Sequence, residues 1–582
     1  MIKKGKSVLS RIAVGDALVY VPFSCDKSLR TYDDTEDVEA LIARYKETKQ
    51  KARGELEALG EQMKQKGGDQ EAFVQAHEEI LLDPVMEEEI LSLIRRDRMY
   101  PDSAMVQVYE NYIQIFSANK NEVIQERAAD LRDVLSRLLR CWHGVPEKKL
   151  SDLEKPCIVI AEELFPSDTL SLDLDHIMGI ITEKGGLTSH TAIIARSLDI
   201  PAILGCEGLT DLVRDGETVI LDGVKEEVVL RPSEEEIRHY EKERDRIEQA
   251  LEINRKYLEK EAVTKDGQKI EIRVNLASPE IRGKERIRFI DGVGLFRSEF
   301  LYLSQDQLPS EEMQYQAYKT VAQAFQEKAV VLRTLDIGGD KQVSYMELPT
   351  EENPFLGNRG IRLCLTHEDI FRTQIRAALR ASAWGNLKLM FPMITSLNEF
   401  RRARDIVYEV GKELDQKHVE WNKDIQIGIM IETPAAALIA DRMIDEIDFA
   451  SVGTNDLTQY LCAADRMNSD VKEYYQDYHP AVFRILGMLA EVFQKAGKTL
   501  SICGELAGEY KAAPVLIGLG VKALSLSITN VPELKRRIRS ITMADAKALA
   551  DEVLRMKTAQ EIEQCLERFE EHIQMESTNE SE

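Results

Sequence analysis

Residues 427–460 read IGIMIETPAAALIADRMIDEIDFASVGTNDLTQY, and this stretch decides the fold. It contains two short apolar runs that each end in polar residues, with a segment of helical composition between them. Buried strands that alternate with helices are typical of a parallel sheet in an α/β protein. Glu432 follows the first run, and Asn455 and Asp456 follow the second. The sequence therefore predicts polar groups at the carboxyl ends of parallel strands.

The same pattern recurs through the carboxy-terminal half of the chain. Eight strand-like runs with helices between them fall within about 260 residues, at 271–277, 292–300, 329–339, 387–394, 425–434, 447–456, 500–506 and 523–528. A (β/α)8 barrel has this number of strands in a chain of this length. We therefore predict a TIM-type (β/α)8 barrel over residues 263–574.

The rest of the chain predicts further domains, so the fold class is multidomain α/β. Short apolar runs broken by Gly and Pro predict an α/β domain formed by residues 1–33 and 143–232. Long stretches with a 3.6-residue period predict a helical bundle inserted at 34–142, either a structural insertion or a docking surface. Residues 233–262 are highly charged and predict a solvated helical linker, and 575–582 predict a polar tail.

The composition limits the classes of function. The chain has 582 residues and a formal net charge of −26, which argues against nonspecific binding to nucleic acid or to anionic membranes. An anionic substrate therefore requires a local basic pocket. No apolar run is long enough to span a membrane, and we expect no signal peptide. The eight cysteines form no CxxC pair, which favours a reduced, cytoplasmic protein.

Polar and charged residues gather where the barrel strands are predicted to end, and in segments that can reach the same mouth. They are Arg297, Arg333, Arg359, Glu432, Asn455, Asp456, Arg466 and Cys503. Taken singly, an arginine at such a position ordinarily forms a surface ion pair, and a free cysteine is ordinarily a buried residue that only packs in the core. Together, the arginines suit phosphate and carboxylate groups, and Glu432 with Asp456 suits Mg²⁺ completed by substrate oxygens. A thiol of Cys503 that faces the pocket would be a proton donor or acceptor.

A histidine lies at the predicted start of a helix in the sequence GGLTSH, residues 185–190. Gly185 and Gly186 allow close backbone approach and positive φ, and Thr188 or Ser189 can cap the helix. The positive end of a helix disfavours a charged imidazole, and it stabilises a phosphoryl anion bound there. An isolated histidine would ordinarily be structural, but this pattern predicts that His190 is nucleophilic.

Four motifs resemble those of the phosphoenolpyruvate-utilising enzyme family: GGLTSHTAIIARSLDIPAILG, IGIMIETPAA, VGTNDLTQY and CGELAG. The order and length of the segments are similar to those of phosphoenolpyruvate-protein phosphotransferases, the Enzyme I group of the bacterial sugar phosphotransferase system. The resemblance implies that the 1–33 and 143–232 domain swivels and carries a histidine, His190, phosphorylated on Nε2. It implies that Thr169 orients this ring and that Cys503 protonates the enolate to give pyruvate.

The resemblance also implies the ligands and partners. Arg297, Arg333, Asn455 and Arg466 would contact phosphoenolpyruvate, and Glu432 and Asp456 would hold Mg²⁺. The bundle would dock an HPr-like phosphocarrier protein, and the barrel would form a homodimer. The members of this family that also carry an ATP-grasp domain are a poorer match, because the chain has no room for that domain.

Two alternatives remain open at this stage. A nitrogen-regulatory relative would use the same chemistry with a different carrier, although such relatives commonly have an N-terminal sensory domain, which we do not expect here. An inactive regulatory binding protein would keep the fold without the chemistry, and the intact Arg, Glu, Asp and His positions argue against it.

Overall fold

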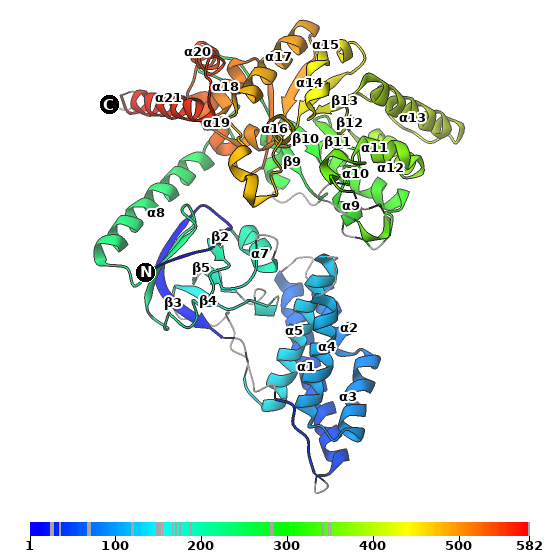
Figure 1. Ribbon diagram of the computed structural model, residues 1–582, viewed down its shortest axis with the longest axis vertical. Helices are drawn as coiled ribbons and strands as arrows, with labels where there is room; N and C mark the ends of the chain where they lie inside the picture. The colour runs from blue at the N-terminus through cyan, green and yellow to red at the C-terminus, as the bar shows by residue number, and fades with distance from the viewer. Residues whose placement is uncertain are drawn as a thin grey trace. The chain divides into compact units, whose positions relative to one another are not determined.

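The structure is a computed structural model. It describes the chain apart from residues 22, 24–27, 34–35, 67–70, 118–121, 147–149, 151–152, 154, 166, 169–171, 174–175, 187–188, 280–283, 304, 306, 339–342, 347, 350 and 580–582. The chain divides into two units, Met1–Gln249 and Ala250–Glu582 (Figure 1). Among the described residues, none of the helices combines the length and the apolar composition needed to cross a membrane.

The carboxy-terminal unit is built on a closed barrel of eight parallel strands. The strands are β9 (Glu271–Leu276), β10 (Gly292–Phe296), β11 (Ala329–Arg333), β12 (Leu387–Phe391), β13 (Ile427–Ile431), β14 (Phe449–Val452), β15 (Thr499–Ile502) and β16 (Ala523–Leu526). Pairing of β16 with β9, in the register Ala523 to Glu271, closes the barrel. Each of the eight predicted runs matches one strand, and only β15 begins one residue before its run, so the predicted barrel is confirmed.

Side chains along these strands alternate between the inside of the barrel and the surrounding helices, as the period of two in a strand requires. Val330 and Leu332 of β11 join the large core between the barrel and the helices. Val331 of the same strand packs instead with Met390 and Met430 in a separate apolar cluster. These two sets show that the barrel interior is filled by side chains and is not a pore.

Helices cover the outside of the barrel and connect its strands. They are α9 (Phe300–Leu303), α10 (Glu311–Phe325), α11 (Ile361–Thr366), α12 (Glu368–Ala381), α13 (Leu397–Gln416), α14 (Pro434–Leu438), α15 (Ala440–Met443), α16 (Thr454–Cys462), α17 (Pro480–Ala496), α18 (Ala513–Gly518), α19 (Val531–Arg539), α20 (Met543–Val553) and α21 (Ala559–Asn579). The last helix runs through the start of the segment expected to be a polar tail, so the expected boundary at 574 falls inside α21.

The amino-terminal unit contains an eight-stranded sheet in the order β1-β8-β7-β3-β4-β5-β6-β2. Its strands are β1 (Ile2–Lys4), β2 (Lys6–Ser7), β3 (Ile12–Tyr20), β4 (Cys157–Ala161), β5 (Ile177–Thr182), β6 (Ala202–Leu204), β7 (Thr218–Asp222) and β8 (Glu227–Leu230). Strand β3 pairs in parallel with β4 and antiparallel with β7, so the start of the chain and the segment after 156 form one sheet, as predicted.

The segment between β3 and β4 forms a helical bundle with its own apolar core, as predicted (Figure 1). Its helices are α1 (Val38–Lys66), α2 (Glu71–Leu81), α3 (Pro84–Arg96), α4 (Pro101–Ser117) and α5 (Glu122–His143). The start of α3 shows why the helices begin where they do. The Asp83 side chain accepts hydrogen bonds from the N–H groups of Val85 and Met86, and Pro84 occupies the first turn.

Helix α8 (Glu234–Arg255) crosses the boundary between the two units. The charge run predicts a solvated linker, but the first half of this helix is packed. Tyr240 is buried in a cluster with Ile12 and Val14 of the sheet, and Ile237 and Ile247 pack against the same cluster. A narrow apolar stripe therefore attaches α8, as far as Ile247, to the amino-terminal sheet.

Candidate functional site

The inward-facing positions at the carboxyl ends of the barrel strands carry the predicted polar groups. Arg333 comes two residues after the inward-facing Val331, and Glu432 comes two residues after Met430. Cys503 follows β15 and belongs to the same inner cluster. The strand period therefore directs these three side chains into one mouth, although up to 170 residues separate them in the sequence.

Arg333 is buried and is held by groups from three strand ends. Its guanidinium forms an ion pair with Glu299, which follows β10, and its Nη1 lies 3.1 Å from Oδ2 of Asp336. The same Nη1 donates to the thioether sulfur of Met430 at 3.5 Å. Burial alone would lower the pKa of Arg333, but the Glu299 and Asp336 carboxylates raise it by more, so this residue is a fixed positive charge.

Arg359 enters the mouth from the loop that follows β11. It is 1% exposed, and it donates to both oxygens of Asp336 and, at 3.1 Å, to Oδ1 of Asp456. Gly338 allows this approach, because a Cβ on it would lie 2.5 Å from Cβ of Arg359 and its φ of +107° suits only glycine. Arg359 therefore links the strand end of β11 to that of β14.

Glu432 is fully buried and accepts the N–H of Met393 on Oε1 at 2.6 Å. Burial raises the pKa of Glu432 to about 8, the nearby carboxylates of Asp456 and Asp336 add to that rise, and the two buried arginines oppose it. Among the described residues, Oε2 accepts no hydrogen bond. The carboxyl group therefore keeps one oxygen free and holds a proton readily.

Asn455 and Asp456 lie in the first turn of α16, directly after β14. The side chain of Asn455 donates to Glu505 at 2.9 Å and accepts the N–H of Glu505 at 2.8 Å. The hydroxyl of Tyr475 donates to the backbone oxygen of Asn455 at 3.3 Å. These contacts fix the Asn455 amide at the rim, between the ends of β14 and β15.

Cys503 presents a protonated thiol in the mouth. Its Sγ donates to the backbone oxygen of Val452 at 3.6 Å. Burial raises the pKa of the thiol to about 11, and the hydroxyl of Ser451 and the charges of Arg333 and Arg297 limit that rise. At neutral pH the group is therefore a thiol with a proton to give, not a thiolate.

Arg297 and Arg466 lie at the rim and not in the buried cluster. Arg297 follows β10 and is exposed, and its charge acts on the Cys503 thiol. Arg466 is half-buried, and its backbone N–H donates to the side chain of Gln459 at 3.2 Å. Burial raises the pKa of Tyr475, and the positive charge of Arg466 opposes that rise.

His190 is the first residue of α7 (His190–Leu198), in the amino-terminal unit. Of the two predicted caps, Ser189 is the N-cap, and its Oγ accepts the N–H of Ala192 at 3.3 Å. Gly185 has a φ of +97°, as the sequence predicts for the turn before the helix. Thr169 lies outside the described residues. The structure therefore confirms that His190 lies at the start of a helix, and the role of Thr169 stays a prediction.

The buried cluster fits a divalent cation. It contains two guanidinium groups and four carboxyl groups, and so carries surplus negative charge when every carboxyl group is ionised: Arg333, Arg359, Glu299, Asp336, Glu432 and Asp456. The open Oε2 of Glu432 faces Gly453, where an added Cβ would lie only 2.9 Å away. No group of three or more His, Cys, Asp or Glu among the described residues is arranged to hold a metal. A cation here would therefore need oxygens from a bound anion in addition to Glu432 and Asp456.

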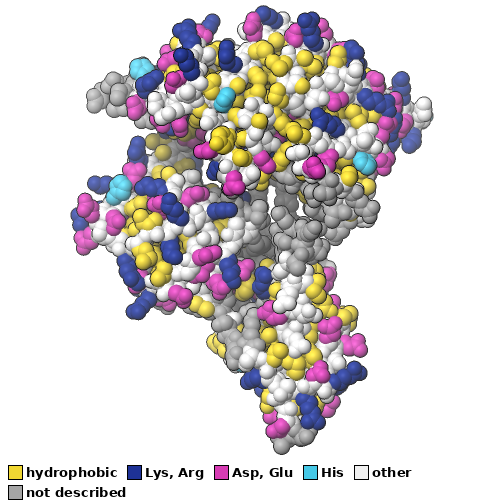
Figure 2. Space-filling view, viewed as in Figure 1, with side chains coloured by type: hydrophobic (Ala, Val, Ile, Leu, Met, Phe, Trp, Pro, Cys, Tyr) yellow, Lys and Arg dark blue, Asp and Glu magenta, His cyan; other side chains and the backbone are white. Residues whose placement is uncertain are grey.

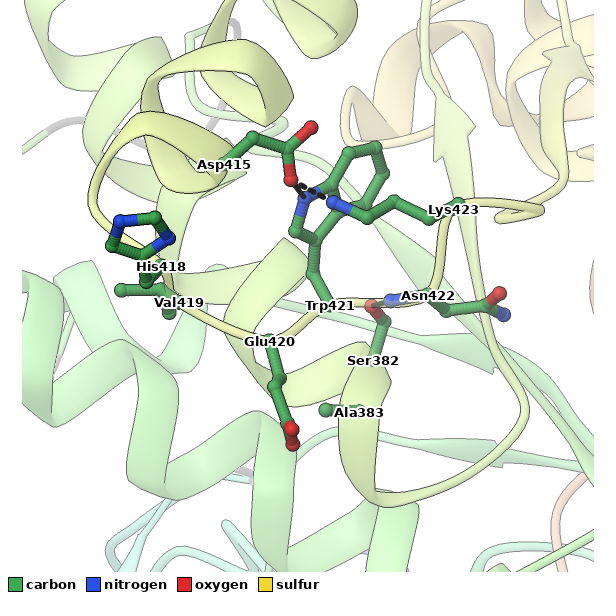
Figure 3. Close-up of a pocket in the computed structure, with 9 residues that line it drawn as sticks. All are labelled: Ser382, Ala383, Asp415, His418, Val419, Glu420, Trp421, Asn422 and Lys423. Carbon is green, nitrogen blue, oxygen red and sulfur yellow. Dashed lines mark hydrogen bonds and ion pairs between the residues drawn. The ribbon is translucent and has the colours of Figure 1, made fainter.

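A separate pocket of about 630 Å³ lies among residues that precede β12 and β13, at the amino ends of the strands (Figure 3). Two of its charged groups pair with each other, because Asp415 forms an ion pair with Lys423, and Asp415 also accepts from the indole N–H of Trp421 at 3.0 Å. It is remote from the mouth and lacks the buried arginines that the mouth carries.

Sequence reasoning did not assign Met430, Met393 or Tyr475 to the site. Met430 lies in a continuous apolar run, and Met393 acts through its backbone, so neither carries a signal in the sequence. Tyr475 lies 20 residues from its partner Asn455, in a segment with no regular period. Glu299 and Asp336 follow the ends of the second and third predicted strands, and that position places them near the mouth, where the structure has them.

Models of the PEP-utilising enzyme family match three segments of the chain: the N-terminal model over residues 4–127, the mobile-domain model over 153–226 and the PEP-binding-domain model over 252–543. The phosphoenolpyruvate-protein phosphotransferase of Listeria monocytogenes is 40% identical over 573 residues, which cover 98% of this chain and 100% of that protein. The chain belongs to the PEP-utilising enzyme family. The resemblance carried by the four sequence motifs is therefore confirmed.

A second curated relative agrees with membership of the PEP-utilising family. The phosphoenolpyruvate-protein phosphotransferase of Priestia megaterium is 42% identical over 527 residues, 90% of this chain and 92% of that protein. A solution structure of an Enzyme I protein is 33% identical, covers 42% of this chain and 99% of its own, and superposes with a TM-score of 0.37.

Proposed function

We propose that the chain transfers the phosphoryl group of phosphoenolpyruvate to its own His190, releases pyruvate, and then passes the phosphoryl group to a histidine of an HPr-like carrier protein. The observation that carries this proposal is the buried pair of arginines beside Glu432, Asp456 and a protonated Cys503. The names of the full-length relatives support it, and they favour it over the nitrogen-regulatory and inactive alternatives.

The reaction begins with substrate binding at the mouth of the barrel. The phosphate and carboxylate groups are bound by Arg297, Arg333, Arg359, Asn455 and Arg466. The positive charges of the four arginines offset the charge on the transferred group. His190 attacks phosphorus in line, and the bond between phosphorus and the enol oxygen breaks. The enolate takes a proton at carbon from Cys503, which gives pyruvate. Phosphohistidine then reacts with the carrier histidine.

His190 and the mouth belong to different units of the chain. The proposed reaction therefore requires the domain with His190, residues 1–33 and 143–232, to approach the barrel and then leave it for the carrier. Residues 233–262, which include α8, are the proposed connection. Ser189 and the free N–H groups at the start of α7 would stabilise the phosphorylated imidazole, and Thr169 is proposed to orient it.

The proposed metal is Mg²⁺, with Glu432 and Asp456 as its protein ligands. When bound there, it would supply positive charge next to the phosphate oxygens. Asp456 is already oriented by Arg359, and Glu432 by the Met393 N–H. These two contacts hold both carboxylates in place before a cation arrives.

The remaining proposals concern partners and location. We assign carrier docking to the bundle, 34–142, and homodimer formation to the barrel domain, 263–574, in a cytoplasmic protein. Exposed apolar side chains on the barrel unit support the homodimer: Leu356, Leu438, Met467 and Tyr474 are each at least 60% exposed. Figure 2 shows apolar side chains gathered over the middle of the visible face of this unit.

Labelled phosphoenolpyruvate tests the proposal. The chain is mixed with phosphoenolpyruvate, Mg²⁺ and candidate carriers, and label is followed onto the chain and onto each carrier while pyruvate is measured. Label on the chain, then on an HPr-type carrier, with one pyruvate released per phosphoryl group, supports the proposal. A chain that binds phosphoenolpyruvate and releases no pyruvate would support the inactive binding protein instead.

A further inference from the structure

One carboxylate in the mouth is shared by both buried arginines. Oδ2 of Asp336 lies 3.1 Å from Nη1 of Arg333 and accepts from Nη2 of Arg359 at 3.1 Å. Oδ1 of Asp336 accepts from Nε and Nη2 of Arg359 at 3.3 and 3.2 Å. A single side chain therefore sets the distance and the relative orientation of the two guanidinium groups.

The position of Asp336 is itself tightly fixed. The residue is 1% exposed and follows β11 by three positions. A Cβ on Gly360 would lie 3.3 Å from its Oδ1, and Gly338 brings the Arg359 backbone against the same loop. The Asp336 carboxylate is therefore buried against Gly360 while it contacts both arginines.

Each arginine also has a second anionic partner, which it contacts through a different terminal nitrogen from the one that contacts Oδ2 of Asp336. Arg333 pairs with Glu299, and Arg359 donates to Asp456 at 3.1 Å. Without Asp336, the two buried positive charges would lose the carboxylate that both contact, and each would be drawn toward its other partner. The spacing between the guanidinium groups depends on Asp336, which touches both of them.

We propose that Asp336 is a positioning residue for phosphoenolpyruvate: its carboxylate holds Arg333 and Arg359 at the spacing that binds the anionic groups of the substrate. This inference rests on the proposed function. Guanidinium groups recognise phosphate and carboxylate through paired N–H groups in a fixed geometry, so a change of spacing weakens binding even when both arginines remain. Asp336 acts through the arginines and takes no part in bond making.

The test is Asp336→Asn, which keeps the shape of the side chain and removes the charge. We expect KM for phosphoenolpyruvate, and Kd from calorimetry with the Mg²⁺-loaded chain, to rise about 10- to 100-fold, the range for a lost charge-assisted hydrogen bond. The value of kcat at saturating substrate should fall by a smaller factor. Asp336→Glu keeps the charge but pushes the carboxylate toward Gly360, and its KM should lie between those of the wild type and Asp336→Asn.

Glu413→Gln is the matched control. Glu413 is also shared by two arginines, Arg372 at 3.1 Å and Arg376 at 2.9 Å, but on α12 and α13, outside the barrel. Its KM should be that of the wild type. An Asp336→Asn variant that folds and keeps the wild-type KM and Kd overturns the inference. If the Asp336→Asn variant does not fold, a wild-type KM in the Asp336→Glu variant overturns the inference instead. A wild-type chain that does not bind phosphoenolpyruvate contradicts the proposed function instead.

Discussion

Replacing the buried Glu432 by Gln should make the chain more stable and inactive at the same time. Burial raises the pKa of this carboxyl group from 4.5 to about 8. Between these two values the unfolded chain has lost the proton that the native chain retains, so stability falls as pH rises through this window. Relative to a neutral side chain at this position, the free energy of unfolding is lower by about 1 kcal/mol at pH 5 and by about 4 kcal/mol at pH 7.5.

Glu432→Gln keeps the acceptor for the Met393 N–H and removes the titration. In EDTA at pH 7.5, its free energy of unfolding should exceed that of the wild type by up to about 4 kcal/mol, and by about 1 kcal/mol at pH 5. Denaturant unfolding followed by tryptophan fluorescence is suitable, because Trp384 and Trp421 lie in the barrel unit and only Trp142 lies elsewhere. Adding Mg²⁺ should reduce the difference in free energy of unfolding between Glu432→Gln and the wild type, since a cation stabilises the ionised carboxylate of the wild type.

The control is a carboxylate with the opposite shift. A hydrogen bond from Arg401 lowers the pKa of the half-buried Glu446, so Glu446→Gln should bring no gain in stability at pH 7.5. The reasoning is refuted if Glu432→Gln is no more stable than the wild type at pH 7.5 in EDTA. It is also refuted if the gain is as large at pH 5 as at pH 7.5.

Cys503→Ser should still accept a phosphoryl group on His190 but release pyruvate about 100-fold more slowly, since it lacks the proposed acid. In the wild type, the thiol has a pKa of about 11, so its titration should not change the rate of pyruvate release between pH 6.5 and 9. Rapid quench measures the phosphoryl transfer, and a coupled assay measures the pyruvate release. Wild-type pyruvate release by the variant would exclude this role. Ser189→Ala should cost about 1 kcal/mol of stability through the lost cap of α7 and should slow phosphoryl transfer. Ser310→Ala, which removes the matching cap of α10, is the control. It should lower stability by a similar amount and leave the rate of phosphoryl transfer unchanged. Equal rates of phosphoryl transfer in both variants would contradict a special role for the α7 cap.

The barrel could be predicted because most of its strands are short apolar runs, and several of them end at or directly before a polar residue. That pattern is local, so no long-range contact was needed to recognise it. The period of two then explains why Arg333, Glu432 and Cys503 point inward. The network around them was beyond local reasoning, because Arg359 reaches Asp336 across 23 residues and Asp456 across 97.

The linker and the tail show the limits of composition. Helix α8 has few apolar residues, and its packing depends on Ile12 and Val14, which are more than 200 residues away in the chain. Helix α21 continues to Asn579 although its last residues are polar, because backbone hydrogen bonds extend a helix that packing has already started. Neither outcome follows from charge alone.

The most direct measurement of the central claim is acid-labile phosphate on the chain after mixing with labelled phosphoenolpyruvate and Mg²⁺. The account predicts about one phosphoryl group on each wild-type chain, lost in acid and retained in base, and none on His190→Ala. Acid-labile label on His190→Ala at the wild-type level would contradict the account.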